Sequence, residues 1–506
     1  MNPATLFQTA LKKTPDKIAY ICGETSVSYC QLDEKARQHE VALKGLGVGK
    51  GDLVALTMHN IPQLPQLYMA LYRIGAIAVP ISPYSSIGDF SFALSHCSAR
   101  LFLTSRELFP AACEAVAAAP LVEKVLVVDD EESSAESIVL PDTAPEVEPC
   151  CLTQSDPLMI LYTSGSTARS KGIVYTCGSL RAAAINRAET LGITVDDTYY
   201  NAGYLCHGAA LTTALLPILY AGGTALFPAR FSVPDFFQSV SRYRPTIAAL
   251  GPSQLWAVLE HPLCASADLT SLRYVTAGGD VVGEQLHGLF QQRMKFPLSE
   301  SIGMTECGTY MTTRPGMPHR TGSMGKPVVG AEVRLVDEDG NDVAPGEIGQ
   351  VVVRTATCMA GYWKDDENTA LALVDGWLYT GDAARMDEDG YYYFAGRIKQ
   401  MLVRDCVNIS PMEVEDAIRQ HPQVKDCGVI GIPDPRHGQK IFAFVQLKPG
   451  DTSFDQHDLA EFAAARVMRV RLPDRWLQVS DLPSTQLGKL DRKRLQEMAM
   501  QSVMSE

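Results

Sequence analysis

The chain has 506 residues, of which 46% are hydrophobic and 20% charged, which is typical of a globular protein with a large core and not of a disordered chain. This length predicts roughly two to four domains. The 58 Asp and Glu residues outnumber the 44 Lys and Arg residues, and the net charge of −14 argues against nucleic-acid backbone as the main ligand.

The 13 cysteines are scattered along the sequence, with no C-x-x-C pair and no His-rich segment beside them. This pattern predicts reduced thiols in a cytoplasmic protein and disfavours a disulfide framework or a structural zinc site. Residues 198–229 carry no formally charged side chain and are long enough to cross a bilayer. Because this stretch contains several glycines and prolines, we expect a buried helix–turn–strand there and no membrane span.

Short apolar runs alternate with helical patterns over the first 150 residues. The runs at residues 17–22, 52–58 and 76–82 predict strands, and residues 31–46 and 61–74 carry helical periodicity between them. The same alternation recurs farther along the chain. Strands that are continuous apolar runs separated by helices indicate parallel sheets covered on both faces.

A different pattern begins at residues 331–354, where strands are joined by the turn sequence DEDGND. Beyond a boundary expected near Gly396–Gln400, PMEVEDAIRQ predicts a helix that begins at Pro411, and CGVIGIP and KIFAFVQL predict strands. We therefore predict an α/β fold with a large N-terminal body, residues 1–397, that has parallel sheets and a small β unit. Residues 398–506 are predicted to form a small, mobile α+β lid.

The strongest local signal is LYTSGSTARSKG, residues 161–172. A predicted strand runs into a loop whose consecutive backbone N–H groups can hold phosphate oxygens, with hydroxyls and Lys171 as further donors. An ordinary Ser/Gly linker has a similar composition. The loop is not a Walker loop, because Ser170 stands where that motif needs Gly and Gly172 where it needs Ser or Thr.

This loop resembles the Thr-Ser-Gly-Ser/Thr-Thr-Gly-x-Pro-Lys-Gly motif of the adenylate-forming enzymes, which include acyl-CoA synthetases, free-standing adenylation domains and luciferases. It departs from that motif at Ala168, which is usually Gly, and at Ser170, which is usually Pro. The resemblance runs in the family's order from TPDKIAY to GKLDRKRL, nearly the whole chain. The phosphate-loop residues that it implies are Thr163, Ser164, Gly165, Ser166, Thr167 and Lys171.

GMTE, residues 303–306, resembles the family's Y-G-x-T-E segment. In the family the Thr contacts the α-phosphate of ATP and the Glu holds magnesium, which implies these roles for Thr305 and Glu306. Ile302 offers an aliphatic face where an aromatic side chain usually packs on adenine. The further ATP-binding residues implied in this region are Gly279, Asp280, Ser301, Ile302 and Gly303.

Three later segments complete the resemblance. In WLYTGD, Asp382 is implied to accept both ribose hydroxyls, for which a carboxylate offers two acceptor oxygens. In FAGRIK, Arg397 is implied as a second ribose or phosphate contact and Lys399 as the hinge of the lid. Lys489 matches the lid lysine that bridges the carboxylate substrate and the α-phosphate.

The implied reaction joins a small carboxylic acid to AMP, with release of pyrophosphate, and uses ATP and magnesium. The acid needs no base because it is ionised at neutral pH, but its approach to a polyanion must be screened by Lys489, magnesium and the loop N–H groups. His207 resembles the family's His at the acid pocket, where it would be a gate or wall rather than a base. A buried histidine with satisfied hydrogen bonds fits the sequence nearly as well.

The acid pocket is expected to be apolar and to suit an aryl or aliphatic acid, because Gly208 stands where amino-acid-activating relatives carry an Asp. The expected lining residues are Tyr204, Cys206, His207, Ala209, Ala277–Gly279, Cys307 and Met311. The acyl group would pass to coenzyme A, as co-substrate, or to a phosphopantetheinyl carrier protein.

Two alternatives remain open. Asp405–Cys406 replace a Gly-Gly pair that lines the thiol tunnel in the family, so the runner-up is an enzyme that loads only a carrier protein or stops at the acyl-adenylate. A degenerate nucleotide-binding sensor is suggested by the departures from the family motifs at Ala168, Ser170 and Ile302. The polar residues that are retained at the site argue against it, namely Glu306, Asp382, Arg397 and Lys489. No nucleic-acid partner is expected, and a homodimer is left open.

Overall fold

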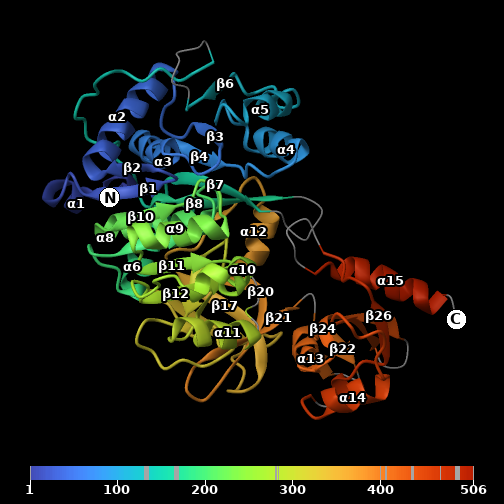
Figure 1. Cartoon of the computed structure of the whole chain (residues 1–506). Helices are drawn as coiled ribbons and strands as arrows, with labels where there is room; N and C mark the ends of the chain where they lie inside the picture. The colour runs from blue at the N-terminus through green and yellow to red at the C-terminus, as the bar shows by residue number, and fades with distance from the viewer. Residues whose placement is uncertain are drawn as a thin grey trace. The chain divides into compact units, whose positions relative to one another are not determined.

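The computed structural model describes residues 2–129, 136–163, 170–279, 282, 284–398, 401–404, 407–434, 438–467, 469–484 and 490–504. The chain divides into two compact units (Figure 1). Unit 1 comprises Met1–Val333 and Val352–Tyr379, and unit 2 comprises Arg334–Val351 and Thr380–Glu506. The boundary at residues 397 and 398 between a body and a lid stays a prediction.

Two large sheets form the framework of unit 1. The seven-stranded sheet has the order β18-β8-β7-β4-β3-β5-β6, and the nine-stranded sheet has the order β15-β14-β13-β12-β11-β9-β10-β1-β2. The strands of the first sheet are β18 (Gly361–Tyr362), β8 (Lys171–Thr176), β7 (Pro157–Thr163), β4 (Ile77–Pro80), β3 (Leu53–Thr57), β5 (Leu101–Thr104) and β6 (Lys124–Val127). Those of the second are β15 (Lys326–Pro327), β14 (Gly308–Thr312), β13 (Ser299–Met304), β12 (Tyr274–Gly278), β11 (Ile247–Leu250), β9 (Thr198–Asn201), β10 (Thr224–Phe227), β1 (Ile18–Cys22) and β2 (Thr25–Ser28).

Both sheets are parallel in their interiors and antiparallel at one or both edges. Strands β3 to β6 pair in parallel, as do β9 to β13, whereas β7–β8 and β13–β14 are antiparallel. The interior strands β4, β5 and β10 are fully buried, which is why they are continuous apolar runs in the sequence. The predicted α/β fold with parallel sheets is confirmed.

Helices cover the two sheets on apolar faces (Figure 1). One core cluster packs α4 and α5 on the seven-stranded sheet, and another packs α9, α10 and α11 on the nine-stranded sheet. The helices of unit 1 are α1 (Gln8–Lys13), α2 (Tyr29–Gly45), α3 (Gln63–Ile74), α4 (Ile87–Cys97), α5 (Phe109–Val116), α6 (Cys177–Leu191), α7 (Gly208–Ala210), α8 (Leu216–Ala221), α9 (Val233–Tyr243), α10 (Pro252–Glu260), α11 (Glu284–Met294) and α12 (Asp366–Ala372).

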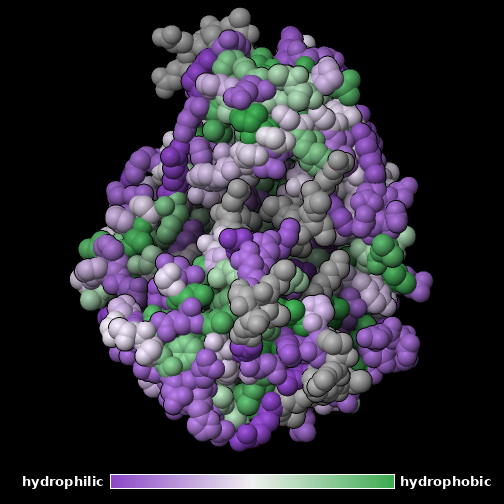
Figure 2. Space-filling model, turned by 90° about the vertical axis from the view of Figure 1, so that its right-hand side faces the viewer, coloured by the Kyte–Doolittle hydropathy of each residue, from purple (hydrophilic) through white to green (hydrophobic). Residues whose placement is uncertain are grey.

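The uncharged stretch at residues 198–229 folds as β9, α7, the π-helix η2 (Leu211–Leu215), α8 and β10, as the expected buried helix–turn–strand. Within the described part of the chain, no helix combines the length and the apolar character needed to cross a membrane. On the face drawn in Figure 2, hydrophilic residues are interspersed with smaller groups of hydrophobic ones.

A five-stranded sheet follows in the order β16-β17-β20-β19, with β21 paired to β20. Its strands are β16 (Ala331–Val336), β17 (Ile348–Thr355), β20 (Trp377–Met386), β19 (Leu373–Val374) and β21 (Tyr392–Arg397), and they confirm the strands predicted between residues 331 and 354.

The C-terminal part of unit 2 is built on a three-stranded sheet of β24 (Val424–Asp434), β25 (Gly438–Leu447) and β26 (Arg475–Val479). The helices α13 (Pro411–Arg419), α14 (Gln456–Ala464) and α15 (Arg492–Met504) accompany it, with the short pair β22 (Leu402–Arg404) and β23 (Val407–Ile409). The helix predicted to begin at Pro411 is confirmed.

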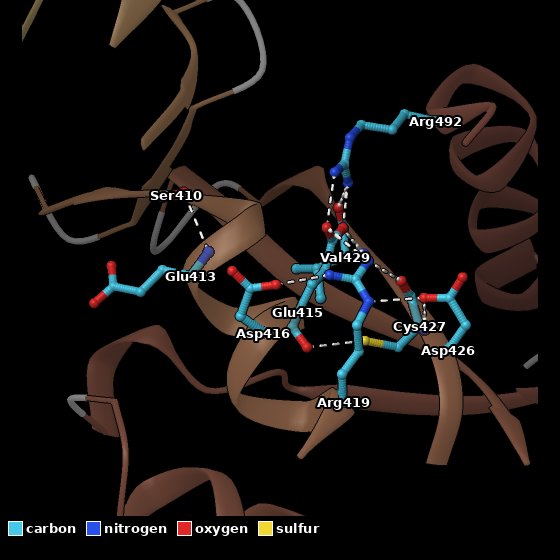
Figure 3. A network of polar contacts seen from close by, with 9 residues as sticks. All are labelled: Ser410, Glu413, Glu415, Asp416, Arg419, Asp426, Cys427, Val429 and Arg492. Atoms are coloured by element: carbon cyan, nitrogen blue, oxygen red, sulfur yellow. Dashed lines mark hydrogen bonds and ion pairs between the residues drawn. The ribbon is translucent and has the colours of Figure 1, made fainter. Parts of the chain in front are cut away.

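A buried ion-pair network joins α13, β24 and α15 (Figure 3). The Glu415 side chain is 2% exposed, and its two oxygens lie 2.5 and 2.9 Å from the two terminal nitrogens of Arg492. The backbone N–H of Val429 also donates to Glu415, at 2.7 Å. Arg419 donates to Asp426 and Asp416 in the same network. The network therefore ties the first residue of α15 to the interior of unit 2.

Contacts within unit 2 also hold the residues on both sides of the segment 485–489, which itself lies outside the described residues. Before it, Ser484 forms a β-bridge with Leu490, and the backbone N–H of Asp491 donates to the carbonyl of Pro483 at 2.8 Å. After it comes Arg492 with its ion pair to Glu415. The two ends of the segment that carries Lys489 are thus fixed by unit 2 itself.

We predict that Glu415→Gln lowers the free energy of unfolding by about 3 kcal/mol, because it leaves the guanidinium of Arg492 partly buried without an anion. The double variant Glu415→Leu with Arg492→Met should recover much of this loss, since it removes both charges. Glu497→Gln, which breaks an exposed pair with Arg494, is the matched control and should change little. Chemical denaturation measures all three, and wild-type stability of Glu415→Gln would contradict the prediction.

Candidate functional site

The predicted phosphate loop joins the antiparallel strands β7 and β8, in which Thr163 pairs with Lys171. Ser164, Gly165, Ser166 and Thr167 lie outside the described residues, and only the backbone of Thr163 is described. Their binding of phosphate stays a prediction. The residues on either side of the loop nevertheless lie on two paired strands.

Lys171 is the loop cation that the structure describes. Its Nζ donates to Asn368 Oδ1 at 2.8 Å and lies 4.6 Å from the ring centroid of Tyr362. Asn368 is held in turn by Asp365, whose carboxylate accepts from both the backbone and the side-chain nitrogen of Asn368. These contacts direct the ammonium group of Lys171 and hold it over an aromatic ring.

Tyr362 connects this lysine to the predicted magnesium ligand. Its hydroxyl donates to Glu306 Oε1 at 3.0 Å. Burial first, and then the negative charge of Glu306, raise the pKa of Tyr362, so the hydroxyl keeps its proton and donates it. Glu306 Oε2 makes no hydrogen bond to a described residue. One aromatic side chain thus contacts a lysine with its ring face and a carboxylate with its hydroxyl.

The GMTE segment is held in place by hydrogen bonds to its backbone. The hydroxyl of Tyr175 on β8 donates to the carbonyl of Thr305 at 2.6 Å, and the N–H of Met359 donates to the carbonyl of Glu306 at 2.7 Å. Gly303 lies where β13 and β14 meet, and a Cβ there would come within 2.5 Å of the carbonyl oxygen of Gly308. A glycine is required at this close approach, and the turn that follows is rigid.

The residues predicted to meet the nucleotide base lie on neighbouring strands. Ser301 on β13 pairs with Gly278 on β12. The Ser301 hydroxyl is already bonded to the hydroxyls of Thr276 and Thr312, at 2.9 and 2.6 Å, so it is held in an interior network. Gly279 has φ +85°, and Ile302 is half-buried. Asp280 lies outside the described residues, and the role of this group in binding ATP stays a prediction.

His207 directly precedes helix α7, and its ring centroid lies 6.1 Å from that of Tyr204. The side chain keeps contact with solvent, yet the surrounding protein is dense enough that burial lowers the pKa of His207. Its ring is therefore neutral at pH 7. Beside it, a Cβ on Gly208 would lie 2.4 Å from Leu161 Cδ1, so no side chain fits there without a shift of Leu161.

Tyr84 was not anticipated from the sequence. Its hydroxyl donates to the hydroxyl of Tyr204 at 3.0 Å, and the two rings lie 4.9 Å apart. No motif contains Tyr84, which is brought to Tyr204 by the fold alone. The same is true of Tyr362, which follows Gly361 in a strand of two residues.

In unit 2, β20 and β21 place Asp382 directly opposite Arg397. Arg397 Nε lies 2.8 Å from Asp382 Oδ1, and the Asp382 side chain is 3% exposed. Arg397 Nη1 also donates to the carbonyl of Thr380 at 3.1 Å. The ion pair fixes the position of the Asp382 carboxylate. Lys399, Asp405–Cys406 and Lys489 lie outside the described residues, so their roles stay predictions.

The donors present fit one magnesium ion bound together with a nucleotide. Mg²⁺ is usually held by one or two carboxylates plus substrate phosphates, rather than by a complete protein cage. Glu306 supplies one carboxylate, with Oε1 fixed by Tyr362 and Oε2 unengaged by the described residues. Within the described ranges no three His, Cys, Asp or Glu side chains gather as a metal cluster. Phosphate and water would complete the coordination shell.

The AMP-binding enzyme family model matches residues 7–363, and the AMP-binding enzyme C-terminal domain model matches residues 413–489. Feruloyl-CoA synthase of an Amycolatopsis species is 32% identical over 482 residues, with 95% of each chain covered. Indoleacetate–CoA ligase of Aromatoleum aromaticum is 30% identical, with 97% of each chain covered. The crystal structure of an anthranilate CoA ligase in complex with anthranoyl-AMP has a TM-score of 0.88 at 28% identity, covering 99% of this chain and 97% of that one.

We predict that Tyr362→Phe weakens magnesium-dependent ATP binding roughly tenfold, as expected for loss of a hydrogen bond to a charged group. The Phe ring keeps its contact with Lys171, so the change isolates the bond that orients Glu306. Isothermal titration of ATP at fixed magnesium measures the effect. Tyr220→Phe, at a 38% exposed site, is the control. Equal ATP affinities for Tyr362→Phe and wild type would show that the bond does not matter.

Proposed function

Because the chain belongs to the AMP-binding enzyme family, we propose that it is an ATP-dependent acid–thiol ligase. It activates a carboxylic acid as acyl-AMP, releases pyrophosphate and transfers the acyl group to a thiol. The observation that carries the proposal is the linkage of Lys171, Tyr362 and Glu306 beside the hairpin predicted to bind phosphate. The relatives named as CoA ligases, which match nearly the whole chain, support the same reaction class.

In the first step, a carboxylate oxygen of the acid attacks the α-phosphorus of ATP. A new P–O bond forms, the bond to the leaving pyrophosphate breaks, and the product is a mixed anhydride. No proton has to be removed, because the acid is already ionised at neutral pH. The barrier arises from the approach of an anion to a polyanion, so fixed positive and donor groups carry most of the catalysis.

The residues have distinct roles in this step. Lys171 screens the phosphates from the first strand after the loop, and the Thr305 hydroxyl donates to the α-phosphate. Glu306 holds magnesium, which screens the phosphate charge when bound. Asp382, positioned by its ion pair with Arg397, accepts the ribose hydroxyls. Lys489 neutralises the acid and the α-phosphate together.

In the second step, a thiol attacks the acyl carbon and AMP leaves. Coenzyme A is the acceptor that the CoA ligases among the relatives support. Asp405–Cys406 favour the second candidate, an enzyme that loads only a carrier protein or stops at the adenylate, because a carboxylate in a thiol tunnel narrows it. The lid hinge at Lys399 would separate the two steps.

The acid is proposed to be aryl or aliphatic. Relatives that act on feruloyl and indoleacetyl groups support a flat aromatic acid. A neutral His207 beside Tyr204 forms a wall for such a group rather than a base. The twelve cysteines in the described residues are free, which supports a reducing compartment, and we propose the cytoplasm.

A panel of carboxylic acids tests the proposal by release of pyrophosphate from ATP, with and without coenzyme A. We expect acid-dependent release, and formation of a CoA thioester when coenzyme A is present. Lys489→Ala should lower acid-dependent release by roughly a hundredfold or more, as expected for loss of a preorganised charge at the reacting atoms. Lys493→Ala, on the first turn of α15, is the matched control for charge.

The outcomes separate the candidates. Release of pyrophosphate without thioester formation favours the carrier-loading or adenylate-only enzyme. Unchanged release by Lys489→Ala, or silence over a broad panel while ATP still binds, would favour a nucleotide-binding sensor instead.

A further inference from the structure

Helix α6 carries a buried arginine for which the described part of the chain supplies no counter-charge. Arg187 is 6% exposed, and its Nε and Nη1 atoms make no hydrogen bond to the residues that the structure describes. No carboxylate in the described ranges forms an ion pair with it. A guanidinium group cannot lose its proton in a protein, and an unpaired charge in the interior strongly destabilises the fold. Such a group is retained when something else binds to it.

Arg187 lines a cavity of about 20 Å³ between α6, η2 and the start of β14. Thr212, Thr213, Gly308 and Thr309 are among the other lining residues. This volume holds one or two oxygen-sized atoms, since a water molecule needs about 10–15 Å³. The cavity thus offers a small polar space in front of a charged donor.

The hydroxyl groups in the wall leave Arg187 as the main donor. Thr212 donates its proton to the carbonyl of Gly208 at 2.7 Å, and Thr213 donates to the carbonyl of Ala209 at 2.6 Å. Both hydroxyls can therefore only accept in the cavity. The hydroxyl of Tyr199 lies near Arg187 and Thr213, and burial raises the pKa of Tyr199 while the charge of Arg187 works to lower it. A group that enters this space faces the positive charge of Arg187. The cavity therefore favours a group that accepts hydrogen bonds.

The walls of the cavity continue the two segments predicted to meet the acid. Cys307 and Gly308 directly follow Glu306, and η2 follows α7, which begins directly after His207. Gly308 is two residues from Glu306, and consecutive Cα atoms are about 3.8 Å apart, so the Cα atoms of these two residues lie within about 8 Å. A π-helix such as η2 is rare and is frequently found at functional sites. The cavity therefore lies close in sequence to both segments predicted to meet the acid.

We propose that Arg187 binds a second carboxylate at the far end of the acid substrate, and that this chain prefers short dicarboxylic acids to monocarboxylic acids of equal length. The inference rests on the proposed function and names the substrate class of that site. A carboxylate displaces water from the cavity and makes charge-assisted hydrogen bonds with Nε and Nη1. It adds one charged group to the otherwise apolar pocket expected from the sequence.

The test compares dicarboxylic acids with monocarboxylic acids of the same carbon skeleton, such as succinate with butyrate and terephthalate with benzoate. We expect wild type to favour the dicarboxylic member of at least one pair by tenfold or more in kcat/KM for pyrophosphate release. Arg187→Met should lower kcat/KM for that acid by about a hundredfold while the monocarboxylic acid gains, so that the preference reverses. Arg187→Lys keeps the charge without the paired donors and should fall between.

Arg181→Met is the matched control, because Arg181 lies on the same helix, is partly exposed and does not line the cavity. It should leave the ratio of the two acids unchanged. Arg187→Met should unfold at the same or a higher denaturant concentration than wild type, since it removes an unpaired buried charge. If Arg187→Met does not fold, the preference for dicarboxylic acids is tested instead with Arg187→Lys and with the binding measurement described below.

Binding is measured separately by isothermal titration of each acid in the presence of a non-hydrolysable ATP analogue. The inference would be overturned if monocarboxylic acids support pyrophosphate release and Arg187→Met leaves the ratio of kcat/KM for the paired acids unchanged. The proposed function would stand in that case. Absence of release with every acid would overturn the proposed function. In that case, equal binding of the paired acids by wild type would overturn the role of Arg187 as well.

Discussion

Repulsion between a carboxylate and a triphosphate is the physical constraint on which the proposed chemistry depends. A protein can meet it only with cations and donors that are held in place before the two anions arrive, because donors that must reorganise during the reaction lose most of their effect. In unit 1 the side chain of Tyr362 holds two charged groups in place. Its ring contacts Lys171, and its hydroxyl donates to Glu306. Each of the two charged groups is thereby oriented by a neutral neighbour.

Unit 2 uses fixed charges in a different way. The ion pair between Glu415 and Arg492 is largely buried. It fixes the position of the chain just after the segment that carries Lys489. Asp382 and Arg397 are opposite each other on paired strands, so their separation is set by the sheet. Charge in this unit therefore serves first to hold short segments at defined positions and only then to bind ligands.

Continuous apolar runs made the parallel strands predictable, and β1, β3 and β4 lie within the runs at residues 17–22, 52–58 and 76–82. The motif residues could also be found, because each stands in a short local pattern. Tyr362 could not, since it meets Glu306 across 56 residues and belongs to no motif. Arg187 was missed for another reason: an arginine in a helical pattern suggests the solvent-facing side, and only the packing of α6 against η2 buries it. Contacts between distant strands likewise place residues 334–351 with unit 2, which no change in composition indicates.

The close approach of Gly208 to Leu161 has a consequence for how this pocket can evolve. In the amino-acid-activating relatives, an acidic side chain stands at the position of Gly208. Here that substitution would collide with a strand residue that leads into the phosphate loop. A lineage that acquires the acid must also shift the end of the Leu161 side chain or exchange Leu161 for a smaller residue. Positions 161 and 208 are therefore coupled in evolution, and a change at one alters what the other can accommodate.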